Sequence, residues 1–223
     1  VSPLDDSTAL RSCLNDFEAF YHANATNLDA TARSTARVYL HLSRLNHAFV
    51  SRQYQAGIQL IPILKKELRL LEAQTDVHRI LLFYYKFAYL HFCDGQYEAA
   101  LGYLNEIIHL KAGSLREDLL HNTRMLHLLC HYELGNYRLL DYLLRAVQRL
   151  FAKATDLSPM LARTLRFLAE LSNKPLSEHT VAFRQFHTAL QPFRESPYER
   201  KAIHYLDVPA WVDGKVGRRG GNA

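Results

Sequence analysis

Two short stretches of the sequence decide the fold class: "FCDGQYEAALGYL" at residues 92–104 and "YELGNYRLLDYLL" at residues 132–144. In both, a glycine stands two residues before a tyrosine, and apolar residues follow at helical spacing. Glycine readily adopts the left-handed backbone conformation that ends a helix. The tyrosine is placed to pack back over the turn. Each stretch therefore predicts the end of one helix, a tight turn and the start of another helix.

The similarity extends along both flanking helices. With Gly95 and Gly135 in register, Tyr97 falls opposite Tyr137. The small or apolar positions on either side also correspond, which predicts that the same helical hairpin occurs twice. These further pairs are Ala88 with Leu128, His91 with His131, Ala100 with Leu140, Leu104 with Leu144, and Ile107 with Val147.

A third copy lies upstream, in "SRQYQAGIQLI" at residues 51–61, with Tyr54 in the tyrosine position and Arg52 in place of the glycine. The three tyrosines are 43 and 40 residues apart. A period of this length, with two antiparallel helices in each unit, is typical of a helical solenoid. We therefore expect an all-α superhelix of antiparallel helical hairpins with about nine or ten helices.

The rest of the chain also has apolar residues at helical spacing. Pro62 interrupts one such segment, which predicts a kink or two shorter helices there. A short helical turn around Trp211 is expected to close the fold. We predict a single helical domain over residues 1–213, followed by a polar, glycine-rich and disordered tail over residues 214–223.

The composition is that of an ordinary globular protein, with 48% hydrophobic and 22% charged residues. The net charge of +5 comes from basic residues that are interleaved with acidic ones, so we do not expect nucleic acid as the main partner. No stretch resembles a signal peptide or a membrane span, and we expect a cytoplasmic protein without membrane contact. Because the chain begins with Val1, we expect a fragment or processed product of a longer chain.

No pattern of catalytic or metal-binding residues emerges from the sequence. His127 and His131 are four residues apart and share a helical face, but no third ligand stands at a diagnostic spacing. The three cysteines, at positions 13, 93 and 130, form no CxxC pair. Phosphate-binding and nucleophile motifs are also missing from the sequence. We therefore expect no enzyme, no cofactor and no metal site.

The repeat resembles the tetratricopeptide-repeat family, most closely over residues 81–110, and the resemblance covers roughly residues 35–155. The family's usual period is about 34 residues, so longer helices or connections are expected here. The closing "YERKAIHYLDVPAWVDGKVG" is similar to the C-terminal end of bacterial helical-repeat proteins. The family-like positions of the best copy are Tyr84, Phe87, Ala88, Gly95, Tyr97, Ala100 and Leu104.

The resemblance implies a concave groove, lined by the first helix of each hairpin, that receives a peptide or a helix. The alternative is that the same apolar face is core, filled from within the domain. The family's clamp for a peptide carboxylate is incomplete here. Asn46 and Phe49 would extend the groove in the first copy. The groove residues implied in the other two copies are Tyr85, Lys86, Tyr89, Phe92, Asn122, Met125, Leu129 and Tyr132.

The leading expectation is therefore a non-enzymatic protein-interaction or scaffolding module of a longer bacterial chain, with a protein or peptide partner. One alternative is a sensor domain that binds a peptide or small ligand. Another is a basic nucleic-acid-binding repeat, which requires the basic patches to merge in space. The two basic patches are Lys65, Lys66 and Arg69, and Arg145, Arg149 and Lys153. The sequence does not indicate an oligomeric state.

Overall fold

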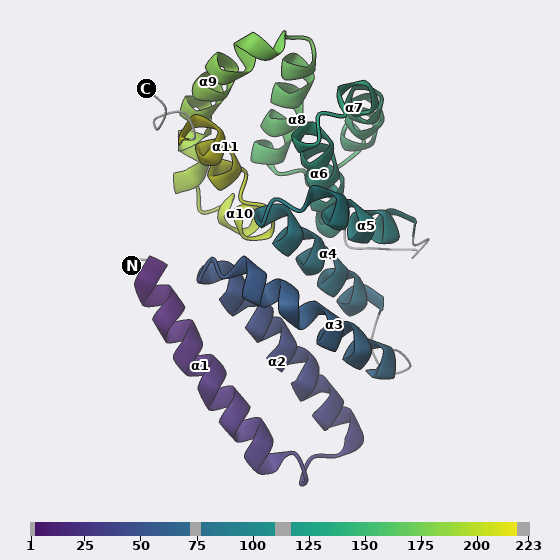
Figure 1. Ribbon diagram of the computed structural model, residues 1–223, viewed down its shortest axis with the longest axis vertical. Coiled ribbons are helices and arrows are strands. Elements are labelled where there is room, and N and C mark those ends of the chain that lie inside the picture. The colour runs from purple at the N-terminus through teal and green to yellow at the C-terminus, as the bar shows by residue number, and fades with distance from the viewer. Residues whose placement is uncertain (1–2, 72–76, 110–116, 218–223) are drawn as a thin grey trace. The chain divides into compact units, whose positions relative to one another are not determined.

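A computed structural model describes the backbone of residues 3–71, 77–109 and 117–217 (Figure 1). Over these ranges the chain forms eleven α-helices and no strand. The all-α prediction is confirmed, but the predicted nine or ten helices were too few, because the expected short turn around Trp211 is a helix of its own. The helices are α1 (Pro3–Asn24), α2 (Ala30–Val50), α3 (Tyr54–Leu71), α4 (Val77–Cys93), α5 (Tyr97–His109), α6 (Glu117–Glu133), α7 (Tyr137–Phe151), α8 (Pro159–Ser172), α9 (Leu176–Glu195), α10 (Arg200–Tyr205) and α11 (Val208–Gly217).

The contacts between residues divide the chain into two compact units, residues 1–112 with α1–α5 and residues 113–223 with α6–α11. The sequence predicted one domain over residues 1–213. Each unit has its own buried apolar side chains.

In the first unit, each helix packs against the helix that follows it in the chain. Figure 1 shows α1 and α2 side by side, joined by a turn at one end. Pro62 is exposed and lies within α3, which continues through it. The helix is therefore not divided into two shorter ones, which was one of the two outcomes expected at this proline. Apolar side chains from α2, α3 and α4 fill the centre of the unit, among them Leu45, Leu64, Phe83, Phe87 and Leu90.

The predicted turn occurs three times with the same hydrogen bonds. Gly95 and Gly135 have φ values of 80° and 70°, in the left-handed region that the sequence predicts for them. Each donates its amide to the carbonyl three residues earlier, and the next amide donates to the carbonyl five residues earlier. Arg52, with φ 54°, makes the same pair of bonds in the first turn. These bonds define a Schellman motif. The turn of the upstream copy at Arg52 therefore has the same backbone hydrogen bonds as the turns at Gly95 and Gly135.

The helix after each turn begins at the repeated tyrosine, since α3, α5 and α7 start at Tyr54, Tyr97 and Tyr137. The first of these helices also makes a close approach that the sequence alone did not predict. A Cβ atom added to Gly57 would lie 2.9 Å from Leu90 Cδ2 and 3.0 Å from Ala48 Cβ. Only a residue without a side chain allows α3 to lie this close to α2 and α4.

In the second unit, α6 is surrounded by other helices, and nearly all of its side chains between residues 119 and 132 are buried. The start of α8 is capped twice. Ser158 Oγ accepts a hydrogen bond from Leu161 N. The buried Glu199 carboxylate accepts bonds from Ser158 Oγ at 2.5 Å and from Met160 N at 3.1 Å. A carboxylate is favoured at a helix N-terminus, and this one ties the segment before α10 to α8.

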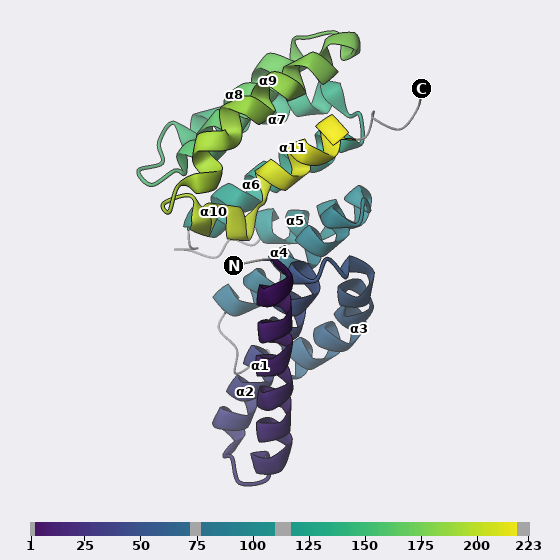
Figure 2. The same cartoon turned by 90° about the vertical axis from the view of Figure 1, so that its left-hand side faces the viewer.

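The last helix, α11, packs along α9, and both views show the two helices lying together (Figures 1 and 2). The Trp211 ring lies 5.3 Å from that of Phe183. Asp207 Oδ1 accepts a bond from Ala210 N, and Pro209 sits in the first turn, where proline is tolerated. Residues 214–217, predicted to begin a disordered tail, belong to α11. The remainder of that predicted tail lies outside the described residues.

Candidate functional site

The predicted groove residues of the first two repeat copies meet on one face of the first unit, formed by α2 and α4. Lys86 Nζ, on α4, donates a hydrogen bond of 2.6 Å to Asn46 Oδ1, on α2. The same ammonium group lies 5.5 Å from the centre of the Phe49 ring, a distance at which a cation is attracted to an aromatic face. We call Asn46, Phe49, Lys86 and Tyr89 the Lys86 site.

The Phe49 ring beside the ammonium group belongs to a set of stacked aromatic rings. The rings of Phe49 and Tyr89 are stacked, with centres 5.2 Å apart and planes 23° from parallel. On either side along α4, Tyr85 and Phe92 each stack on Tyr89 at 6.4 Å. Each member of the Lys86 site is partly exposed, whereas Tyr85 and Phe92 are buried beneath it. The site is therefore a small aromatic surface with one cation beside the Phe49 ring.

Lys86 has no opposite charge beside it among the described residues. Among the residues that the structure describes, no carboxylate lies within ion-pair distance of it, and its ammonium group is held by a neutral amide and a ring. Burial lowers the pKa of Lys86 from its ordinary 10.5 to about 8, because a charged group loses hydration inside the protein. The group is still mainly protonated at pH 7 and can donate hydrogen bonds to an incoming acceptor.

Two arginines on α2 have acidic partners supplied by neighbouring helices. Arg37 pairs with Glu67 at 2.8 Å, and Arg44 pairs with Glu18 at the same distance. His41 also contacts Glu67. Burial lowers the pKa of His41 despite this neighbour. Such pairs join α2 to α3 and to α1, and they account for these charges without a ligand.

The remaining four predicted groove residues are buried inside the second unit. Met125 and Leu129 have no exposed surface, and Asn122 and Tyr132 have 4% and 8%. Asn122 Nδ2 donates to the backbone of its own helix, while its Oδ1 atom is buried without a hydrogen-bond partner. The structure thus brings together the first half of the predicted set at a partly open face and encloses the second half. A binding role for the eight residues stays a prediction.

The C-terminal helices cover the end of α6 around Tyr132. Its hydroxyl group lies 3.1 Å from His179 Nδ1, and Trp211 packs edge-on against its ring. Glu133 accepts hydrogen bonds from Trp211 Nε1 and Lys215 Nζ, both at 2.6 Å. The sequence suggested that residues near Trp211 cover the last hairpin, but it did not indicate that Glu133 would be their anchor.

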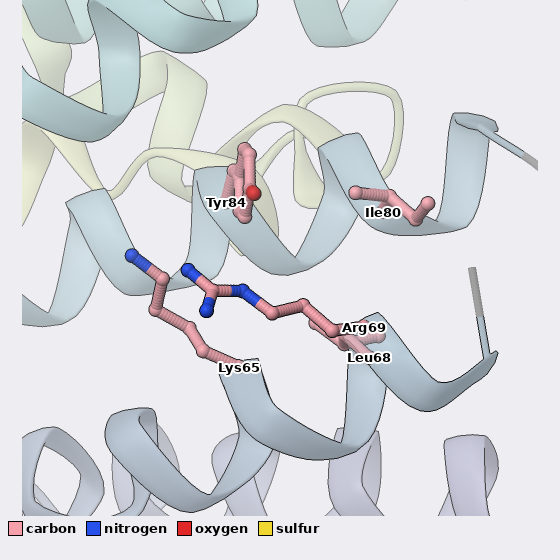
Figure 3. A pocket seen from close by; sticks show the side chains of 5 residues that line it. All are labelled: Lys65, Leu68, Arg69, Ile80 and Tyr84. Carbon is pink, nitrogen blue, oxygen red and sulfur yellow. The ribbon is translucent and has the colours of Figure 1, made fainter.

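A second surface feature lies between α3 and α4. Figure 3 shows the cationic ends of Lys65 and Arg69 pointing to the same end of a shallow pocket, which Leu68, Ile80 and Tyr84 also line. Lys65 Nζ lies over the Tyr103 ring at 5.2 Å. The pocket belongs to one of the two predicted basic patches, and the other patch lies on and after α7 in the second unit. The condition that the two patches merge is therefore not met within either unit.

The histidine pair predicted to pack rather than to bind metal lies inside the second unit. His127 and His131 are both buried, with ring centres 4.6 Å apart. His131 Nδ1 lies 3.2 Å from the Asn136 amide of the following turn. His91 and Gln96 repeat this contact at 2.9 Å in the preceding copy. Within the described ranges, no group of three potential ligands is placed to hold a metal ion.

Comparison with known proteins adds no family. No family model, no curated protein and no solved structure matches this chain. Of the helices that the structure describes, none has both the length and the apolar composition needed to cross a membrane.

Proposed function

We propose that this chain is a non-enzymatic protein-interaction module of the tetratricopeptide-like class, and that the Lys86 site holds an acidic segment of a partner protein. The threefold turn supports the class. The observation that carries the proposed function is the Lys86 ammonium group, which has an amide and a ring around it but no described carboxylate. Buried charges in proteins are normally paired, and a carboxylate from a partner would complete the site.

The surroundings of the ammonium group favour a peptide over a free small anion. Phe49 and Tyr89 offer partly exposed, stacked rings beside the charge. Aromatic side chains of this kind bury much apolar area at an interface and are enriched among its strongest contacts. An Asp or Glu with an apolar neighbour therefore fits the site better than a carboxylate alone. The proposed partner segment carries both features.

Selection from a displayed library of random peptides tests this function. The library is offered in parallel to the unmodified chain, to Lys86→Met and to Lys65→Met. The last variant removes a lysine of the same unit that also lies over an aromatic ring, that of Tyr103. We expect the unmodified chain and Lys65→Met to enrich the same peptides, with an acidic residue beside an apolar one, and Lys86→Met to lose them. Enrichment of the same peptides by Lys86→Met would contradict the proposal.

The variant Asn46→Asp provides a second arm. It places a carboxylate where the amide oxygen now lies 2.6 Å from Lys86 Nζ. The internal ion pair would satisfy the lysine and compete with the acidic side chain of the peptide. Selected peptides are expected to bind Asn46→Asp at least about tenfold more weakly than the unmodified chain. Equal affinities would show that Lys86 does not receive the peptide carboxylate.

A further inference from the structure

The second unit exposes an apolar stripe along α7 that its own fold does not use. Leu139, Tyr142 and Leu150 are 45%, 63% and 44% exposed. Successive residues of an α-helix are about 100° apart around its axis, so these three side chains lie within a sector of about 80°. The buried side of the same helix, formed by Leu140, Leu144, Val147 and Phe151, points in a different direction.

A ridge of positive charge runs beside this stripe. Arg138, Arg145 and Arg149 are all exposed, and Lys153 follows just after the helix. Arg145 pairs with Asp141 on the same helix at 2.7 Å. No described carboxylate forms an ion pair with Arg138, Arg149 or Lys153. The ridge therefore keeps most of its charge available.

Helix α7 lies at the edge of its unit. Its main contacts within the unit are with α6 and α8, which lie on one side of it in Figure 1. From Leu139 to Leu150 the stripe is about 16 Å long, which is about three turns of helix. A helix of that length with leucines on one side and acidic residues beside them would match both the apolar stripe and the positive ridge.

We propose that the outer face of α7 is a docking surface for an acidic amphipathic helix of a partner protein. This surface is separate from the Lys86 site and does not depend on it. The stripe supplies the apolar area and the ridge selects the charge of the occupant, since complementary charge steers association and disfavours basic partners. Exposed apolar residues are ordinary when scattered singly. Here three large ones share one face of a single helix.

The test uses the full chain and a fluorescein-labelled helical peptide of about three turns, with leucines on one side and glutamates beside them. Binding is followed by fluorescence anisotropy. We expect saturable binding that weakens at least about tenfold in Leu139→Asp/Leu150→Asp. Arg138→Glu/Arg149→Glu should also weaken binding and should reduce its dependence on salt. The matched control is Leu176→Asp/Val181→Asp, which changes two exposed apolar residues of α9, at 63% and 53% exposure, and should bind normally.

Four results would overturn the proposal. The first two are that the peptide does not bind the unmodified chain, and that the α7 and α9 variants bind it equally well. The third is concentration-dependent self-association that Leu139→Asp/Leu150→Asp abolishes, which would assign the face to a second copy of this chain. The fourth is binding to vesicles of anionic lipid that the same variant abolishes, which would assign the face to a membrane surface. Circular dichroism of each variant shows whether the unit remains folded. The variant Arg138→Glu/Arg149→Glu changes only exposed side chains, so its effect on binding can be read without a change in the core.

Discussion

At the scale of single residues, Lys86 differs from two arginines of α2 in the groups that surround its charge. Arg37 and Arg44 have carboxylates at 2.8 Å from neighbouring helices. Among the described residues, Lys86 contacts the Asn46 amide and the Phe49 ring but no carboxylate, and burial lowers its pKa to about 8. A buried charge without a charged partner lowers the stability of the folded protein. We interpret this lysine as retained for the proposed binding of an acidic partner segment.

Replacing this lysine should therefore stabilise the free protein. At pH 7 we expect Lys86→Met to raise the free energy of unfolding by roughly 1 kcal/mol, because a methionine of similar length keeps the packing and removes the poorly hydrated charge. Because the pKa is lower in the folded state, the unfolded chain binds more protons between pH 8 and the ordinary value of 10.5. The stability contribution of Lys86 therefore rises with pH across that window.

Urea unfolding of the two proteins at pH 7 and pH 10.5 measures this effect, with Lys65→Met as the control. The advantage of Lys86→Met should shrink at the higher pH. A loss of several kcal/mol in Lys86→Met at pH 7, as in a truncated core residue, would mean that the lysine supports the fold and is not kept for binding.

At the scale of helices and turns, the sequence predicted the parts whose cause is local. The left-handed backbone at Gly95 and Gly135 follows from the residue type and was confirmed. The family resemblance implied that Asn46 and Lys86 line the same groove, and in the structure their side chains bond to each other. The contact of His41 with Glu67 was missed, because it depends on the rotation of α3 against α2. The same applies to Gly57, whose close approach to Leu90 arises only from packing.

The three turns predict opposite effects for matched substitutions. Gly95→Ala should cost about 1 kcal/mol through backbone strain alone, since an added Cβ atom meets nothing within 4 Å. Arg52→Gly should stabilise by roughly 0.5 kcal/mol, because Arg52 already holds a positive φ. Gly102→Ala is the control. Its site is equally open but lies within helix α5, so it should stabilise by about 0.5–1 kcal/mol. Urea unfolding measures all three, and a gain in Gly95→Ala would contradict the assigned turn.

At the scale of the whole molecule, contacts between residues divide the chain into two units, and the single domain over residues 1–213 stays a prediction. The repeat register continues from one unit to the next, and for that reason the sequence predicted a single domain. The boundary between the two units is set by how many contacts neighbouring helices make, and the repeat register does not reveal this. In the second unit the predicted groove residues of α6 are buried, and α9 and α11 cover Tyr132 among them. The first unit keeps its equivalent face partly open at Tyr89.

This division predicts that residues 1–112 fold without the rest of the chain. Their described buried apolar side chains come from α2, α3, α4 and α5, among them Leu104 and Ile107 of α5. Expressed by themselves, they should show a helical circular dichroism spectrum and a cooperative thermal transition. A fragment that is unfolded, while the full chain is folded under the same conditions, would support the single domain that the sequence predicted.

The most direct test of the proposed interaction function is the pKa of Lys86 in the free, full-length chain. It can be measured by NMR after the lysines are labelled with carbon-13 by reductive methylation, with the resonance assigned by its loss in Lys86→Met. We predict a pKa of about 8 in the free protein, rising toward the ordinary range when a selected acidic peptide binds, because a carboxylate stabilises the charged form. A pKa near 10.5 in the free protein would show that Lys86 is already satisfied and would contradict the assignment of the site.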